Sequence, residues 1–108
     1  SQLSHIPTAF ICSRDSSAYQ LLKILKEKNI RVPEDVSITG FDDYILSSLC
    51  TPKITTYSID VAKLTDSCIW LLLDRIAQPD RPLRHIVISG KIMERDSVRT
   101  LSTNPESR

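Results

Sequence analysis

The chain has 108 residues, of which 41% are hydrophobic and 25% are charged, and this composition predicts one modest globular domain at most. Its 14 lysines and arginines against 13 acidic residues give a net charge of +1, so it lacks the basic excess that drives binding to a phosphate backbone. The 3 cysteines fit no CxxC pair and no Cys/His zinc spacing, and no run approaches the roughly 20 apolar residues of a membrane helix. These features argue against DNA binding, zinc binding and membrane insertion by these residues, and predict reduced, packed thiols in a cytoplasmic protein.

The first elements expected along the chain are a strand and a helix. Residues 8–12 form a short apolar run, which is typical of a strand buried on both faces of a parallel sheet. Asp15 and Ser16 are favourable N-cap residues, and apolar side chains then recur at helical spacing over residues 18–25. Asn29 suits a left-handed cap, so the helix is expected to end just before it.

A second strand is expected over residues 36–41, after a proline-containing connection. Strand, helix and strand within about 35 residues predict a right-handed parallel crossover unit. Asp42 and Asp43 follow this strand directly. Ligands of open parallel sheets bind at the carboxyl ends of the strands, so these two carboxylates are the first indication of a binding site.

The middle of the chain predicts a loop, a strand and a longer helix. Residues 44–53 show no clean period and are expected to form a loop with at most one helical turn. Residues 54–59 have the β-branched and aromatic content of a strand, and Asp60 is a good cap for a helix over residues 61–76. The apolar stripe of that helix is wide enough to need cover from more than one neighbour, and Trp70 falls on its far side, where it would meet another chain or a missing segment.

The last part of the chain predicts one extended segment and a tail. Residues 85–89 and 91–93 are expected to be extended, and residues 102–108 are expected to be disordered. Only two glycines exist, so no glycine-rich loop can hold a phosphate or a dinucleotide. The acidic residues do not follow the order of a phospho-acceptor receiver domain, and no Ser/His/Asp arrangement is evident. We therefore expect no catalytic residue, no metal ligand, no cofactor and no enzymatic activity.

Five short segments occur in an order and with gaps that are specific in combination. They are PTAFIC leading to DSSA, RVPEDVSI, GFDD, PKITT and IMERDSV, and they span about residues 7–98. This pattern resembles the lactose-repressor (LacI/GalR-type) family of bacterial transcriptional regulators, whose members share their fold with periplasmic sugar-binding proteins. In that family an N-terminal helix-turn-helix reads DNA, and a small molecule binds in the cleft between two α/β lobes.

The resemblance implies a partial α/β, parallel-sheet periplasmic-binding-protein-like fold. Its expected divisions are the end of the C-terminal lobe (1–43), a crossover loop (44–53), a segment of the N-terminal lobe (54–90), a return strand to the C-terminal lobe (91–101) and the tail (102–108). The implied function is effector binding and dimerisation within a sugar-responsive repressor that contacts DNA only through a helix-turn-helix outside these residues. The alternative is a fragment of a periplasmic sugar-binding protein that serves a transporter.

Three residues resemble ligand contacts of the family, and each has a plainer interpretation. Asp42 matches the position whose carboxylate accepts hydrogen bonds from the effector, or it is a turn residue after a strand. Arg14 stands where many members carry a polar residue, frequently Asn, that touches the ligand. It would bind a phosphate or a carboxylate of the effector, remain solvated, or pair with Asp15 or Asp42. Val61 matches a position that stacks on a sugar ring, or it is core. Asp43 is expected to hold the loop through side-chain to backbone bonds.

A second group of residues resembles the interface between the C-terminal lobes of a dimer. From the first helix they are Tyr19, Leu22 and Lys23, and from the following loop they are Leu46 to Cys50. The plainer interpretation of Tyr19 is a half-exposed surface aromatic. The expected partners are therefore a small-molecule effector and further copies of the chain in a homodimer or a higher homo-oligomer, without a membrane.

Overall fold

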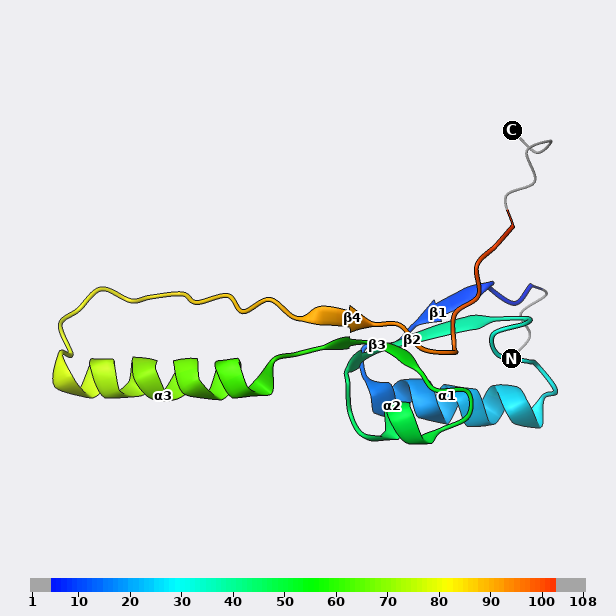
Figure 1. Cartoon of the computed structure of the whole chain (residues 1–108), viewed down its shortest axis with the longest axis horizontal. Coiled ribbons are helices and arrows are strands. Elements are labelled where there is room, and N and C mark those ends of the chain that lie inside the picture. The colour runs from blue at the N-terminus through cyan, green and yellow to red at the C-terminus, as the bar shows by residue number, and fades with distance from the viewer. Residues whose placement is uncertain (1–4, 103–108) are drawn as a thin grey trace. The chain divides into compact units, whose positions relative to one another are not determined.

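The computed structural model describes residues 5–102. In chain order its elements are β1 (Ala9–Ile11), α1 (Asp15–Glu27), β2 (Ser37–Asp42), α2 (Leu46–Leu49), β3 (Thr55–Ser58), α3 (Val61–Ala77) and β4 (Lys91–Met93) (Figure 1). The chain divides into two compact units, one made of the residues up to Ser58 and from Ile92 onward, the other of Ile59–Lys91. The alternation of strands and helices confirms the expected α/β class.

The strands of the first unit form a sheet in the order β1-β2-β3-β4. Parallel pairing joins β1 to β2, with Ala9 opposite Ser37, and β2 to β3, with Thr39 opposite Thr55. The predicted parallel β-α-β unit is confirmed. β3 pairs with β2 in the same sheet, and the two compact units divide after Ser58. The assignment of residues to the two lobes stays a prediction.

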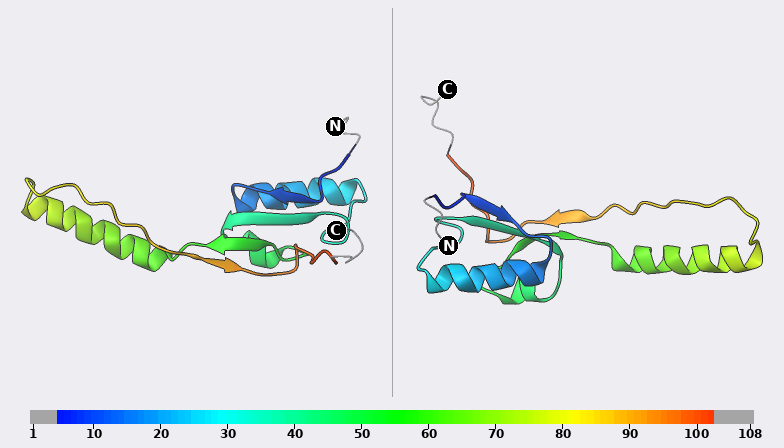
Figure 2. Two further views of the ribbon diagram at one scale, coloured as in Figure 1. Left: turned by 90° about the horizontal axis from the view of Figure 1, so that it is seen from above. Right: turned by 180° about the vertical axis from the view of Figure 1, so that it is seen from behind.

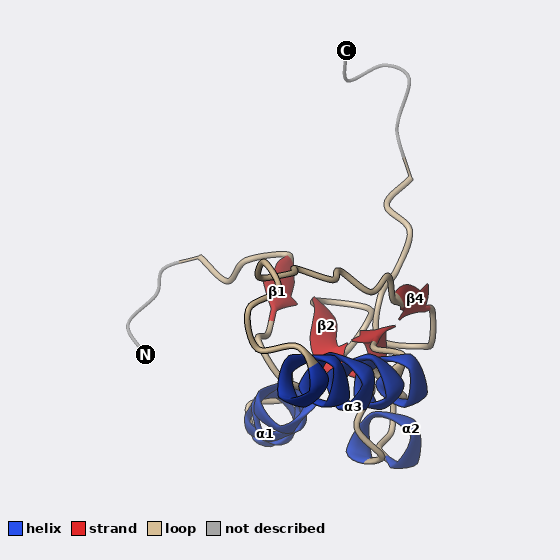
Figure 3. Ribbon diagram, turned by 90° about the vertical axis from the view of Figure 1, so that its left-hand side faces the viewer, coloured by secondary structure: helices blue, strands red, loops and turns tan. Residues whose placement is uncertain are grey.

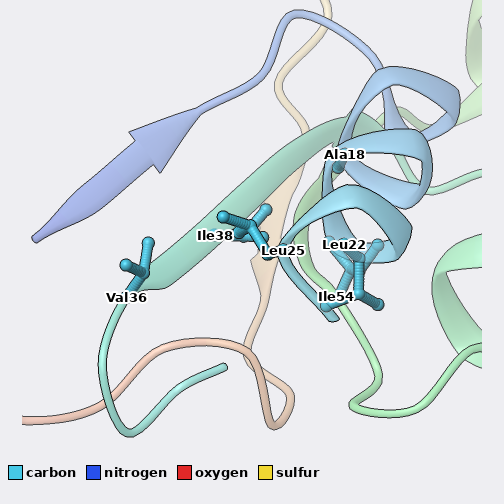
Figure 4. Packing of buried hydrophobic residues seen from close by; sticks show 6 residues of the cluster. All are labelled: Ala18, Leu22, Leu25, Val36, Ile38 and Ile54. Carbon is cyan, nitrogen blue, oxygen red and sulfur yellow. The ribbon is translucent and has the colours of Figure 1, made fainter. Parts of the chain in front are cut away.

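The core of this unit lies between one face of the sheet and α1. Figure 3 shows α1 and α2 on the same side of the strands, and Figure 2 shows α1 running along β1 and β2. The cluster of buried apolar side chains shown in Figure 4 consists of Ala18, Leu22, Leu25, Val36, Ile38 and Ile54. Burying each of the larger side chains stabilises the fold by roughly 1.5–3 kcal/mol. Three segments of the chain therefore depend on one small core.

The opposite face of β1 is open, and the prediction of a strand buried on both faces is wrong for β1. Ile11 is 90% exposed and Ala9 is also exposed, whereas Phe10 between them packs against the core. Side chains alternate between the two faces of a strand, and among the described residues α1 covers only the face to which Phe10 points. Burial of the other face is therefore missing.

The two ends of α1 differ in how well the sequence predicts them. Asn29 has φ 58 and follows the last turn, as expected of a left-handed cap. At the other end, the prediction of Asp15 or Ser16 as N-cap is wrong, because Arg14 precedes the helix in extended conformation and provides no side-chain cap. Asp15 is the first helical residue and is only 1% exposed, since its carboxylate turns inward.

The second unit consists of α3 and the segment that follows it. Asp60 caps the helix as predicted, with its Oδ1 accepting a hydrogen bond from the Lys63 backbone N–H at 3.0 Å. No residue of α3 is buried, and apolar side chains such as Leu72 and Ile76 are 60% and 68% exposed. Within the described residues, the wide apolar stripe therefore lacks the cover that it was predicted to need.

The segment after α3 is fixed to the helix by polar contacts. Arg81 forms an ion pair with Asp74 at 2.7 Å, and the Arg75 guanidinium donates to the Pro79 carbonyl at 2.8 Å. The Arg84 guanidinium lies 5.1 Å from the centre of the Trp70 ring, which is 47% exposed. The role of Trp70 toward another chain stays a prediction.

The last predicted extended segment, residues 85–93, is only partly a strand. Residues 91–93 form β4, but residues 85–89 belong to no strand. Of the predicted disordered tail, all but Ser102 lies outside the described residues. No helix between residues 5 and 102 combines the length and the apolar composition needed to cross a bilayer.

Candidate functional site

The carboxyl ends of the parallel strands bring two charged side chains to one edge of the sheet. Asp42 is the last residue of β2 and lies opposite Ser58, the last residue of β3. Arg14 follows the end of β1, the strand on the other side of β2. Both side chains are exposed, and within residues 5–102 neither makes a hydrogen bond or an ion pair. Both charges therefore remain available to a solute.

The backbone at Asp42 adopts a conformation that L-amino acids rarely take. Its φ is 98, and the following Asp43 has φ 55. A left-handed conformation costs an L-residue roughly 1–2 kcal/mol, and such outliers persist only where the surroundings determine them. The structure therefore holds the Asp42 carboxylate at the end of β2 at an energetic cost.

Asp15 supports the loop that follows Asp42. Its Oδ2 accepts a hydrogen bond from the Tyr44 backbone N–H at 2.6 Å, and its Oδ1 accepts one from the Thr56 hydroxyl at 2.7 Å. Within residues 5–102 Asp15 forms no ion pair with Arg14, the pairing that was one alternative for that arginine. A Cβ on Gly40 would lie 2.0 Å from Asp15 Oδ1. Gly40, a glycine inside a strand, was the sequence signal for this close approach.

Asp43 is held by Arg95, which sequence reasoning missed. Arg95 Nη2 lies 2.6 Å from Asp43 Oδ1, and its side chain is 15% exposed. The Ser47 hydroxyl also donates to Asp43 Oδ1, at 3.4 Å. The hydrogen bond from Arg95 lowers the pKa of Asp43 from its ordinary value of 3.8. Asp43 therefore fixes the loop as predicted, although its carboxylate binds side chains and not the backbone.

The segment after β4 joins β2 to β3 through a second buried contact. The Ser97 hydroxyl, which is fully buried, accepts a hydrogen bond from the Thr55 backbone N–H at 2.8 Å and donates to the Ile38 carbonyl at 2.5 Å. The Ile38 N–H in turn donates to the Ser97 carbonyl at 2.9 Å. Residues 95–97 thus pack against the strands that carry the candidate site. The sequence analysis did not predict these contacts because the partners are far apart in the chain.

An aromatic pair lies next to the strand ends. Phe41 and Tyr57 are opposite each other in the register of β2 and β3, and their rings stack with centroids 5.3 Å apart and 13° between the planes. The preceding residues, Gly40 and Thr56, face Asp15 of α1. Because consecutive strand residues alternate between faces, the aromatic pair lies on the face of the sheet opposite α1. Phe41 remains 40% exposed, so part of this aromatic pair is open to solvent.

A hollow of this unit lies elsewhere. It has a volume of about 650 Å³ and is lined by Leu22, Lys26, Ile30 and Pro52 among others. It is near the C-terminal end of α1, whereas Arg14 precedes the N-terminal end, and a 13-residue helix is about 20 Å long. The hollow is therefore separate from the strand ends. Within residues 5–102, no cluster of His, Cys, Asp and Glu has the three members that a metal site needs.

Residues 1–98 match the protein family described as periplasmic binding protein-like domain. The chain belongs to this family. A probable HTH-type transcriptional repressor, ExuR of Bacillus subtilis (strain 168), is 37% identical to it over 101 residues, which are 94% of the chain and 30% of ExuR. The chain therefore spans about a third of the length of such a relative.

Solved structures agree with this assignment. A LacI family transcriptional regulator from Enterococcus faecium with bound ribose is 28% identical, with a TM-score of 0.81 over 91% of this chain and 37% of that one. The complex of the transcriptional regulator CelR with cellobiose is 27% identical, with a TM-score of 0.79 over 83% of this chain and 28% of CelR. The predicted membership of the lactose-repressor family and the periplasmic-binding-protein-like fold are confirmed. These relatives are repressors and regulators, not enzymes, in agreement with the expected binding function.

The expected interface residues of this periplasmic binding protein-like domain lie on α1 and around α2. Tyr19 is half-buried, and Lys23 Nζ lies 5.7 Å from the centre of its ring. Leu22 is only 7% exposed because it packs in the core, so it offers little surface to a partner. Leu46 and Cys50 are half-buried. The interface itself stays a prediction.

The remaining predicted residues have mixed environments. Val61 is 63% exposed at the start of α3, so within this chain it is not a core residue, and it belongs to the second compact unit. All three cysteines are free. Burial raises the pKa of the Cys12 and Cys50 thiols, as expected of packed thiols, but Cys68 is exposed.

Proposed function

We propose that the chain is the C-terminal part of the effector-binding domain of a LacI-type transcriptional repressor. The effector would bind at the carboxyl ends of β1 and β2, where Arg14 and Asp42 lie; we call this site the strand-end edge. The observation that carries the proposal is the exposed Asp42 carboxylate, which has no protein partner within residues 5–102 and is held in left-handed backbone at the end of a parallel strand. Ligands of such sheets bind at this edge. Residues in rarely populated backbone conformations cluster at active sites and ligand-binding sites.

The chemistry of the edge favours a sugar or a related metabolite. An ionised carboxylate offers about four lone-pair sites and accepts hydrogen bonds from hydroxyl groups. One relative was solved with ribose and another with cellobiose, which supports a sugar as the effector class here. Asp42 would accept hydrogen bonds from the hydroxyl groups of the sugar.

Arg14 gives this site a charge of the opposite sign. Asp15 and Asp43 bind other groups, and Arg14 has no partner within the described residues. A planar guanidinium binds carboxylate and phosphate groups through two parallel hydrogen bonds. We propose that Arg14 binds an acidic group of the effector, so that the preferred effector is a sugar acid or a sugar phosphate.

The two compact units correspond to parts of two lobes in this proposal. Residues 5–58 and 92–101 would belong to the C-terminal lobe, and residues 59–91 would belong to the N-terminal lobe, where Val61 contacts the sugar ring. Effector binding would favour one conformation of the whole repressor and so change the DNA affinity of its helix-turn-helix. Tyr19, Lys23 and the residues near α2 would join two copies. A repressor acts on DNA, so we place it inside the cell.

A thermal-shift screen of the full-length protein tests the function. The panel contains neutral sugars, sugar acids, sugar phosphates and nucleobases, because a compound that binds only the folded state raises the melting temperature. We expect a shift with at least one sugar or sugar derivative. Asp42→Asn should abolish most of that shift, since the amide has lost the charge that strengthens the hydrogen bonds.

Glu27→Gln is the matched control for this screen. Glu27 is an exposed carboxylate at the far end of α1, so its substitution should leave the shift unchanged. Equal shifts in the wild type and in Asp42→Asn would contradict the role of Asp42. A panel without any hit would contradict the effector-binding function.

A further inference from the structure

The loop after Asp42 is fixed at several points, and Arg95 provides the charged one. Its Nη2 donates to Asp43 Oδ1 at 2.6 Å, while its Nη1 donates to Ser47 Oγ at 2.8 Å and to the Ile54 carbonyl at 3.0 Å. One guanidinium therefore binds the beginning, the middle and the end of the loop between β2 and β3. Such charge-assisted hydrogen bonds are stronger than neutral ones, and the planar guanidinium fixes their directions.

Arg95 is itself held in place. Its backbone N–H donates to the Thr55 hydroxyl at 2.9 Å, and the next residue, Asp96, donates its N–H to the Lys53 carbonyl at 3.0 Å. Two residues further on, Ser97 is fully buried between β2 and β3. The guanidinium thus starts from an ordered backbone, which is what a residue that orients others requires.

The strained backbone of Asp42 depends on what lies on its two sides. Before it, Gly40 packs directly against Asp15. After it, Asp43 is bound through its carboxylate by Arg95 and through its N–H by the Thr56 hydroxyl at 3.3 Å. Without the bond from Arg95, the residue after Asp42 would lose its strongest contact and the loop could relax toward an ordinary φ.

We propose that Arg95 is a positioning residue for the effector site, which holds Asp42 in its left-handed conformation by binding Asp43, Ser47 and the Ile54 carbonyl. The inference rests on the proposed function of Asp42, but it concerns a residue 53 positions later in the chain, whose guanidinium binds Asp43, Ser47 and the Ile54 carbonyl. It explains why the segment after β4 returns to the strands that carry the site. It also makes the order of this loop depend on one partly buried side chain.

The first test needs no effector. Hydrogen exchange in the full-length protein is compared between wild type, Arg95→Met and Arg95→Lys, using peptides that cover the loop after β2 and, for comparison, α1. We expect Arg95→Met to accelerate exchange of the Asp43 and Tyr44 amides about tenfold or more, because loss of a charged hydrogen bond corresponds to at least that factor. Exchange within α1 should stay unchanged. Arg95→Lys should recover part of the protection, since it keeps the charge but cannot bind in three directions.

The second test measures affinity for the sugar or sugar derivative with the largest shift in the screen, by titration calorimetry at a temperature where every variant is folded. A purely structural Arg95 would change stability and leave this affinity alone, whereas a positioning role lowers it about tenfold in Arg95→Met. Asp43→Asn should produce a similar loss, and the double variant should lose little more than either single one. Arg31→Met is the control. Arg31 forms an ion pair with Asp35, but the two side chains are 70% and 38% exposed, so loss of this pair should not change the affinity.

The outcomes separate this inference from the proposed function. Unchanged loop exchange together with unchanged affinity in Arg95→Met would overturn the positioning role, even if the wild type binds a sugar well. If the wild type binds nothing in the screen, the effector-binding function fails, and the exchange experiment alone decides whether Arg95 orders the loop. If Arg95→Met does not fold, Arg95→Lys carries both measurements, with the same criteria.

Discussion

Replacing Asp42 with glycine should make the protein more stable and a poorer binder at once. Asp42 has φ 98, which costs an L-residue roughly 1–2 kcal/mol, and glycine adopts such angles freely. Glycine gives back about 0.5–1 kcal/mol through the larger entropy of its unfolded chain. The net gain in the free energy of unfolding is therefore up to about 1.5 kcal/mol, and each kcal/mol raises the melting temperature by about 2–4 °C for a protein of a few hundred residues.

The same substitution removes the carboxylate that we propose accepts hydrogen bonds from the effector. A hydrogen bond to a charged group contributes about 1.5–3 kcal/mol, so the effector affinity should fall about tenfold to a hundredfold. Urea unfolding and calorimetric titration measure the two quantities on the same preparations. Asp42→Asn is the companion variant, since asparagine tolerates positive φ and should keep the stability while it loses affinity.

The two measurements together decide between the interpretations of Asp42. A stabilised Asp42→Gly protein that keeps its affinity would refute the binding role and leave Asp42 as a turn residue. A clear loss of stability would refute the argument from strain, because the carboxylate would then contribute to folding. Only opposite changes in stability and affinity agree with a residue that is retained for binding at a cost to folding.

Three further predictions concern the neighbours of Asp42. Gly40→Ala should destabilise the protein by about 3 kcal/mol in urea unfolding, because the new Cβ would lie 2.0 Å from Asp15 Oδ1 and displace a buried carboxylate; wild-type stability would contradict this packing. The pKa of Asp43 is lowered by Arg95, so the pair contributes stability that is present above the unfolded value of 3.8 and lost as the pH falls through the lower folded value. Acid unfolding of Asp43→Asn should accordingly depend less on pH than that of the wild type, and identical profiles would count against the ion pair. Arg14→Gln should weaken binding of acidic sugars about tenfold and leave neutral sugars unaffected, as measured by calorimetry; an equal effect on both would indicate that Arg14 binds no acidic group.

Local sequence signals predicted most of the elements of this fold. The helical spacing of apolar residues located α1, and Asn29 and Asp60 were recognised as caps because their roles depend only on nearby residues. The polar Asp42 after an apolar strand located the strand-end edge for the same reason. A structural feature that depends only on residues close together in the chain can be predicted from a single sequence.

Contacts between distant residues were not predictable in this way. Arg95 binds Asp43 across 52 positions, and Ser97 binds Ile38 across 59. Neither residue carries a local pattern that indicates its partner, and a single sequence contains no information on which residues vary together. Asp15 was misassigned as a cap because its type suits that role, while the partners that turn it inward come from β3 and from the loop after β2.

The exposed apolar surfaces were mispredicted for a different reason. Apolar periodicity indicates which face of an element prefers burial, but not whether these residues supply the cover. Ile11 on β1 and Ile76 on α3 lie on such faces, and both are largely exposed. Because the chain spans about a third of a relative such as ExuR, the pattern was correct about preference and wrong about the cover found within residues 5–102.

Three aspartates close together at the strand ends show how this small unit divides structural and binding work. Asp15 is buried and binds two neutral donors, and Asp43 is partly buried and binds a guanidinium. Both satisfy their lone pairs within the protein, as buried carboxylates must. Asp42 alone of the three is left without a partner in the described residues, and its φ of 98 is larger than the positive φ of 55 at Asp43. The hydrogen bonds of Asp15 and Asp43 fix the residues around Asp42. These contacts therefore offset the unfavourable backbone conformation that orients the open Asp42 carboxylate. Substitutions at Asp15 or Asp43 should therefore impair binding through loss of order, whereas substitutions at Asp42 should impair it directly.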